Sequence, residues 1–249
     1  MKKLIIISLA LLIGFGSFAQ KRKKSKNQNT DITLDVAKIK KALRYADYET
    51  AISSLYDVIQ KEGETSTYLD SLAYLYFSTG RYASCALVTK DVLDKDESKA
   101  NMLELRAISL SNLGNTVEAI DAYQKLVPLT KNIHHYYELA LLQYSIKRLA
   151  EAAISIKNAE AIEATEKDFV NIPLDKNQAQ KVPIMAAIYN LHGLIAYDLD
   201  KTNTEAPKQA FQKALEIFPD FVLAQNNMKA MEQPKEDKKS LAPTEEKKK

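Results

Sequence analysis

Residues 80–92 read GRYASCALVTKDV and residues 114–126 read GNTVEAIDAYQKL, and the two segments align at a spacing of 34 residues. In this alignment Gly80 matches Gly114, and small or apolar residues fall on small or apolar residues. The same ladder continues for one further unit on each side, with a one-residue shortening in the forward direction. A period that is kept over four units indicates a repeat protein.

Composition favours helices over strands. The 249-residue chain has only six glycines and no tryptophan, and the helix formers Ala, Leu, Lys, Glu, Ile and Gln dominate it. A chain of this length could form one domain or two, but the repetition indicates one continuous array. We therefore expect an almost entirely helical protein.

The repeats place small residues where two helices of a unit face each other. Ala73 and Ala107, on the first helices of units two and three, are expected to face Cys85 and Ala119 on the second helices. Small side chains let two helices approach closely. Cys85 is the only cysteine, so it cannot form an intramolecular disulfide. We predict that it fills a packing position and has no redox role.

The fourth unit has the residue preferences of a known repeat. Tyr136, Leu139 and Ala140 stand at its fourth, seventh and eighth positions, and residues 214–219, ALEIFP, have the form of a closing segment. Over about residues 34–231 the chain resembles tetratricopeptide repeat (TPR) proteins. This resemblance implies an all-α protein, a right-handed α-solenoid of about five helix-turn-helix units with a C-terminal capping helix.

The resemblance also divides the array. It assigns units to about residues 34–63, 66–99, 100–132, 133–164 and 184–219, and a cap helix to residues 220–233. Unit one lacks the small residue at its eighth position and has no turn glycine. An insertion at residues 165–183 interrupts the array, and Pro173 and Pro183 argue against a continuous helix there. In the fifth unit the turn from Asp200 to Ala206 is longer by about two residues.

No active site is visible in the sequence. His134 and Glu138 would share a helical face, but two ligands do not make a zinc site and no third stands at a matching spacing. The chain has no phosphate-binding glycine loop, no Gly-x-Ser-x-Gly motif and no Cys-x-x-Cys motif. We expect a protein that is not an enzyme and that has no cofactor and no metal. An enzyme that uses the insertion as a lid would rest on loop length alone.

The resemblance implies a concave groove lined by the first helix of each unit. The inward positions of the family correspond here to Asp70, Tyr74, Phe77, Asn101, Glu104, Ile108, His134, Tyr137, Leu141, Tyr144, Asn190, Leu194 and Tyr197. Aromatic, amide and acidic side chains suit an extended or helical peptide, and the carboxylates favour a basic one. The alternative is that Tyr74, Tyr144 and Tyr197 simply pack between neighbouring first helices.

One known ligand class of the family does not fit this chain. The best-known TPR groove holds the terminal carboxylate of a peptide with lysine, asparagine and arginine side chains. The places that would carry those cations hold Asp70, His134 and Glu138 here. Because acidic side chains repel a carboxylate, we do not expect recognition of a chaperone tail.

The first 19 residues have the pattern of a secretory signal peptide, with a positive start, an apolar run at residues 4–15 and small residues before Gln20. We expect cleavage there, a basic disordered leader at residues 20–33 and a disordered charged tail at residues 234–249. The chain would then be an exported bacterial TPR protein. The alternative is an uncleaved N-terminal membrane anchor, although the apolar run is shorter than the roughly 20 residues that span a bilayer.

Charge is distributed unevenly. The whole chain carries +3, of which residues 1–19, 20–29 and 235–249 hold +2, +5 and +2, so residues 30–234 carry −6. A basic tail can contact anionic lipid or nucleic acid, but no aromatic residue is interleaved with these lysines. We expect solvated ends and no nucleic-acid partner, and a weak contact of the tails with a membrane surface stays open.

These expectations combine into one function and one alternative. We expect a non-catalytic scaffold or adaptor that is exported to the periplasm or cell envelope and binds a peptide or protein segment in its groove. The alternative is a cell-envelope assembly component that docks on membrane or anionic polymer through its basic tails.

Overall fold

A computed structural model of the protein describes residues 31–174 and 178–232. The expected signal peptide, residues 20–30 of the leader and the tail at 234–249 lie outside the described residues. The described residues form eleven helices, α1 (Thr33–Arg44), α2 (Tyr48–Glu62), α3 (Tyr68–Ser78), α4 (Tyr82–Leu93), α5 (Ala100–Asn112), α6 (Thr116–Thr130), α7 (Ile133–Ser145), α8 (Leu149–Glu160), α9 (Ile184–Leu199), α10 (Glu205–Ile217) and α11 (Val222–Glu232), and two strands, β1 (Phe169–Pro173) and β2 (Ala179–Pro183). Across this described part, no helix is long and apolar enough to cross a membrane.

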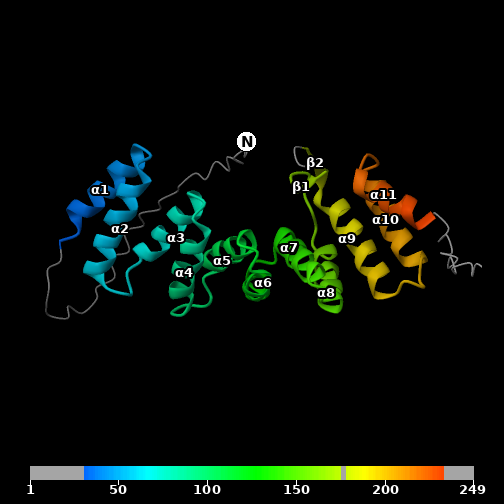
Figure 1. The fold of residues 1–249 in the computed structure, drawn as a ribbon, viewed down its shortest axis with the longest axis horizontal. Helices are drawn as coiled ribbons and strands as arrows, with labels where there is room; N and C mark the ends of the chain where they lie inside the picture. Colours follow the sequence, from blue (N-terminus) through cyan, green and yellow to red (C-terminus); the bar gives the residue numbers. More distant parts are fainter. Residues whose placement is uncertain (1–30, 175–177, 233–249) are drawn as a thin grey trace, which may run out of the picture. The chain divides into compact units, whose positions relative to one another are not determined.

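Consecutive helices pack in pairs. Helices α1 and α2, α3 and α4, α5 and α6, α7 and α8, and α9 and α10 form five hairpins. The first helix of each following hairpin packs against the second helix of the hairpin before it, and α11 packs against α10 (Figure 1). This arrangement confirms the predicted all-α solenoid of five helix-turn-helix units with a C-terminal capping helix.

Small residues sit at the centre of the hairpins. Ala73, Cys85, Ala107 and Ala119 are completely buried, as their spacing in the repeat predicts. Burial raises the pKa of the Cys85 thiol, and a thiol that stays protonated is a poor nucleophile. Cys85 therefore stands where a small packing side chain is needed.

The turns between paired helices use the left-handed backbone region. Gly80 and Gly114 have φ angles of 72° and 74°, which glycine adopts without a steric penalty. In unit one Ala46 takes this place with φ 55°, and in unit four Lys147 does so with φ 61°. A side chain in this region costs roughly 1–2 kcal/mol, so the hairpin contacts of these two units must hold the turn in place.

The insertion forms a β-hairpin, which the sequence did not predict. Strands β1 and β2 are antiparallel, with Val170 opposite Val182 and Ile172 opposite Gln180. Val170 and Ile172 pack against the hydrophobic cluster that α7 to α11 share. The side chain of Gln180 donates a hydrogen bond of 2.5 Å to the carbonyl of Asp220 and thereby ties the hairpin to the segment before α11.

Candidate functional site

The residues predicted for the groove come from α3, α5, α7 and α9, the first helices of units two to five. We call their shared outer side the first-helix face, and it comprises Asp70, Tyr74, Asn101, Glu104, Ile108, His134, Glu138, Leu141, Tyr144, Leu194 and Tyr197. Ile108, Leu141, Leu194 and Tyr197 are half-buried, so apolar surface remains in reach of a ligand. Asn101 is exposed and offers an amide.

Side-chain hydrogen bonds link the first helices in the first half of this face. The Asn101 amide donates to the Tyr74 hydroxyl at 3.0 Å and so connects α3 to α5. His135 Nε2 lies 3.4 Å from a carboxylate oxygen of Glu104 and so connects α5 to α7. These contacts join predicted residues of units two and three to each other and to His135 of unit four, which was not predicted for the groove.

The same pattern continues in the second half of the array. The Tyr144 hydroxyl donates to Asp198 at 3.1 Å and connects α7 to α9. Burial, together with this carboxylate, raises the pKa of Tyr144 to about 12. Lys147 donates to the same carboxylate at 2.8 Å and holds the pKa of Asp198 below its usual range. Tyr74 and Tyr144 thus both bridge neighbouring first helices. This agrees with the alternative stated above, in which these tyrosines pack between first helices.

Three predicted residues do not lie open on this face. Tyr137 is only 4% exposed and packs in the core, because helical periodicity turns it inward with Ile133 and Ala140. Asn190 is 6% exposed, and the Asn227 amide of α11 donates to it at 2.8 Å. The capping helix therefore covers this position. The prediction that Tyr137 and Asn190 line an open groove is wrong.

Phe77 is the third of these residues. It is half-buried, and its ring meets the ring of Tyr82 edge-on, with centroids 5.9 Å apart. Tyr82 begins α4, the second helix of the same unit. Phe77 thus contributes to the packing of its own hairpin, where an edge-to-face pair is favourable.

The first-helix face is acidic. Helices α3, α5, α7 and α9 contain four carboxylates, at Asp70, Glu104, Glu138 and Asp198, three histidines, and one residue that is lysine or arginine, Arg106. The Arg106 side chain bonds to α4 and α6 and does not belong to the face. A surface with this balance attracts basic ligands and repels acidic ones.

Two of the predicted polar residues already have partners. Both carboxylate oxygens of Asp70 accept from Lys99, at 2.9 and 3.0 Å. His134 Nε2 lies 3.2 Å from Asp168, which precedes β1. Hydrogen bonds from Thr165, followed by the contact with His134, hold the pKa of Asp168 below its usual range. His134, which was predicted to line the groove, is therefore engaged in an internal contact between α7 and the base of the β-hairpin.

Glu138 is the free carboxylate of this face. Its side chain is exposed, and it has no hydrogen bond or ion pair among the residues described. Partial desolvation by the surrounding protein raises its pKa, against the opposing effect of His134 and His135. A cationic group bound here would lower that pKa and gain a charge partner.

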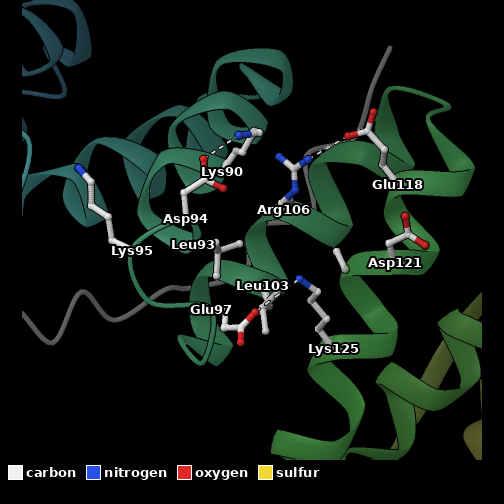
Figure 2. Close-up of a pocket in the computed structure, with 11 residues that line it drawn as sticks. Lys90, Leu93, Asp94, Lys95, Glu97, Leu103, Arg106, Glu118, Asp121 and Lys125 are labelled. Carbon is white, nitrogen blue, oxygen red and sulfur yellow. Dashed lines mark hydrogen bonds and ion pairs between the residues drawn. The ribbon is translucent and has the colours of Figure 1, made fainter.

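A pocket lies outside the predicted site. It has a volume of about 510 Å³ and is formed by α4, α5 and α6 (Figure 2). Its apolar lining is Leu93, Leu103 and Ala122, and its polar lining includes Arg106 and Asp121. Sequence reasoning did not single out these residues. A signal was present, since Arg106 stands where the 34-residue period places a leucine.

Solved structures share this arrangement of helices. A crystal structure of MamA protein matches with a TM-score of 0.57 and 19% identity, over 82% of this chain and 96% of the other. YrrB, described as a TPR protein with an unusual peptide-binding site, matches with a TM-score of 0.60 and 17% identity, over 80% of this chain and 92% of its own. The fold is that of tetratricopeptide repeat proteins.

A further TPR protein, from Parabacteroides merdae, matches with a TM-score of 0.56 and 16% identity, over 80% of this chain and 72% of its own. No protein-family model matches the sequence, and no curated protein matches it. The assignment of the TPR fold therefore rests on the course of the backbone and on the 34-residue repeat in the sequence. In this fold the predicted first helices lie next to one another.

Proposed function

We propose that this TPR protein is a non-catalytic scaffold that binds a segment of another protein on its first-helix face. The observation that carries the proposal is the row of first helices linked by side-chain contacts, whose free carboxylate, Glu138, and exposed amide, Asn101, point away from the core. The likeness in fold to YrrB, a TPR protein with a peptide-binding site, supports it.

The charge of the face defines the class of partner. Because the face has no free lysine or arginine and carries Glu104 and Glu138, it favours a segment that contains basic side chains. Half-buried Ile108 and Leu141 supply apolar contact beside those carboxylates. An extended or helical segment with alternating basic and apolar residues fits this combination.

A pair of substitutions to lysine tests the proposal. Asn101→Lys and Glu138→Lys, made together, add two cations to the face without changing a buried side chain. Partners are crosslinked in the native host through a photoreactive residue at position 108 and identified by mass spectrometry. We expect the double variant to lose crosslinked partner peptides that the wild type retains.

A matched control separates the face from net charge. Asp57→Asn and Asp91→Lys raise the net charge by the same amount as the face variant, at exposed positions on the second helices α2 and α4. This pair should leave the crosslinked peptides unchanged. If the face variant also leaves them unchanged, the first-helix face is not the binding surface.

We also propose that the chain is exported, with residues 1–19 as the cleaved signal and the periplasm or cell envelope as its destination. The pattern of the first 19 residues supports this proposal. Fractionation of the native host and the mass of the purified protein test it. A mature chain that starts at Gln20 is expected, and an intact N-terminus in the membrane fraction would instead favour an anchor.

The charge of the two ends supports a second candidate function. Residues 20–29 carry +5 and residues 235–249 carry +2, next to a body of −6. A cell-envelope assembly component could use these ends to dock weakly on membrane or anionic polymer, with the array as a spacer. Envelope association should then be lost in added salt and on removal of both segments. Fractionation that neither change affects would exclude this candidate.

A further inference from the structure

Arg106 occupies a place that holds leucine in the neighbouring units. Counted along the repeat, it corresponds to Leu72 in unit two and Leu139 in unit four. These leucines are 1% and 3% exposed, and each packs its helix against the second helix of the preceding unit. The Arg106 side chain is 17% exposed. Withdrawing a guanidinium from water is unfavourable, so an arginine at this place needs a reason.

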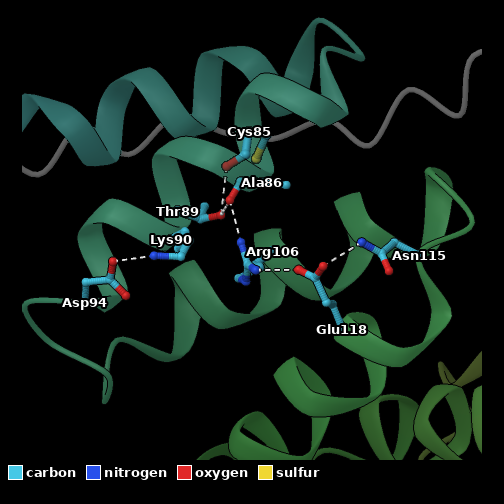
Figure 3. A network of polar contacts seen from close by, with 8 residues as sticks. All are labelled: Cys85, Ala86, Thr89, Lys90, Asp94, Arg106, Asn115 and Glu118. Atoms are coloured by element: carbon cyan, nitrogen blue, oxygen red, sulfur yellow. Dashed lines mark hydrogen bonds and ion pairs between the residues drawn. The ribbon is translucent and has the colours of Figure 1, made fainter.

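The guanidinium is tied to two helices (Figure 3). Nη1 donates to the carbonyl of Ala86 on α4 at 2.6 Å, and Nη2 donates to Glu118 on α6 at 2.9 Å. The other carboxylate oxygen of Glu118 accepts from the Asn115 amide at 2.8 Å. The Arg106 side chain also lines a pocket. The pocket of about 510 Å³ lies beside it, with Leu103 and Ala122 among its lining.

The charges that line the pocket are almost fully paired. Three ion pairs surround it, Lys90–Asp94, Arg106–Glu118 and Lys125–Glu97, with N···O distances of 2.6, 2.9 and 3.8 Å. Lys95 donates to the carbonyl of Glu64, in the segment before α3. Asp121 is exposed and has no hydrogen bond or ion pair within the described part of the chain (Figure 2). Four basic and four acidic residues line the pocket, and Asp121 is the one of these eight without a hydrogen bond or ion pair in the described part of the chain.

We propose that this pocket is a second binding site, which takes a lysine or arginine side chain from a partner protein. The aliphatic stem of such a side chain packs on Leu93, Leu103 and Ala122, and its charged head pairs with Asp121. Long basic side chains combine these two features. The volume of the pocket is within the range of small-ligand sites. The site lies on α4, α5 and α6 and does not depend on the first-helix face.

Methyl-detected NMR on the full chain tests the proposal with a defined probe, N-acetyl-lysine methylamide. The matching norleucine and glutamate derivatives serve as comparison probes. The lysine probe is expected to shift the methyl signals of Leu93, Leu103 and Ala122 in a saturable way. Asp121→Asn should weaken this binding by about two- to fivefold, as expected for a solvent-accessible ion pair.

Two further variants complete the design. Arg106→Leu removes the guanidinium that pairs with Glu118 at the pocket and should strengthen the response to the lysine probe, while the methyl signals of Leu139 and Leu194 confirm that the variant is folded. Asp57→Asn, on α2, removes an exposed carboxylate outside the pocket and should leave the affinity unchanged.

Several results would overturn the proposal. Pocket methyls that respond to the glutamate probe but not to the lysine probe would identify a site for acidic groups, and an equal response to norleucine would remove the role of charge. An unchanged affinity in Asp121→Asn or in Arg106→Leu would exclude the assigned residues. A lysine probe that shifts only Leu141 and Leu194 would support the first-helix face and reject the pocket.

Discussion

The junction between units two and three differs from the junction between units three and four at one repeat position. At the later junction α7 buries Leu139 against α6, in a cluster with Ala122 and Tyr123. At the earlier junction α5 places Arg106 against α4, and its guanidinium bonds to a carbonyl and to a carboxylate. The same backbone can therefore hold two units together by packing or by polar contacts. A pocket that Arg106 helps to line lies beside the polar junction.

The energetic difference between the junctions follows from burial. A fully buried leucine contributes about 1.5–3 kcal/mol through the hydrophobic effect. The ion pair between the mostly buried Arg106 and the half-exposed Glu118 contributes little net stability, because desolvation of the guanidinium and solvent screening of the carboxylate offset the attraction between the charges. At the contact between α4 and α5 the array therefore has less apolar packing than at the contact between α6 and α7. It has charged side chains there instead, which a ligand can reach.

Leu139→Arg should have the largest effect. It places a guanidinium at the junction between units three and four, where no free carboxylate of the described residues is available to pair with it. The residue that corresponds to Glu118 is Glu151, and it already contacts Gln124 and Arg148. A buried guanidinium without a free acid should lower the free energy of unfolding by about 3–5 kcal/mol. Urea denaturation followed by circular dichroism measures the change.

The control for this variant is Ile154→Arg, on α8, where the side chain is 64% exposed. Its effect should stay below about 0.5 kcal/mol, as is usual for surface positions. A loss of less than about 1 kcal/mol in Leu139→Arg would show that this junction tolerates arginine, and the contrast with Arg106 would then have no energetic basis.

Gly193→Ala should have the next largest effect. Units two to four carry alanine at this place, but in unit five a Cβ on Gly193 would clash with Cε1 of the buried Phe211 ring. Overpacking of this kind costs about 1–3 kcal/mol. Thermal denaturation should show a lower midpoint, and Phe211→Leu combined with Gly193→Ala should lose less than the two single losses added together. Additive losses would place the steric conflict elsewhere.

The repeat ladder predicted the hairpins and the buried small residues, because a 34-residue period fixes which residues meet inside a unit. It failed at Tyr137, since a helix places that side chain with Ile133 and Ala140 in the core although the family's pattern places it in the groove. It also failed at Asn190, where coverage depends on the capping helix.

Two other features depend on contacts that a repeat pattern does not contain. The β-hairpin at residues 169–183 is made of short strands that carry lysine, glutamine and asparagine, and it is stabilised by packing against α9 and by Gln180. The pocket depends on how the charges of α4, α5 and α6 pair. The mismatch of Arg106 with Leu72 was visible in the sequence, but the geometry of Glu118 and Asp121 was not.

Arg106→Leu should have a smaller effect of the opposite sign. It installs the packing of the other junction and leaves Glu118 half exposed with its Asn115 contact. Replacement of a buried ion pair by an apolar side chain is often neutral or stabilising, so we expect a gain of about 1 kcal/mol in the free energy of unfolding. A clear loss would show that the bonds to Ala86 and Glu118 outweigh the packing, and the polar junction would then be a stabilising device.

The smallest effect extends the comparison to Glu138, a carboxylate without the partner that Glu118 has. Its pKa is raised in the folded protein above the ordinary value of 4.5. The protonated form is thus favoured on folding, so the contribution of Glu138 to stability is complete below pH 4.5 and is lost as the pH rises through the raised pKa. Glu138→Gln, which cannot ionise, should have a higher melting temperature than the wild type at pH 7 and the same melting temperature at acidic pH.

Glu166→Gln, at an exposed position before β1, should show no such pH-dependent difference. A Glu138→Gln variant that is less stable at pH 7 would mean that the ionised carboxylate is stabilised on this face, and the face would then be less open to a basic partner than its charge indicates.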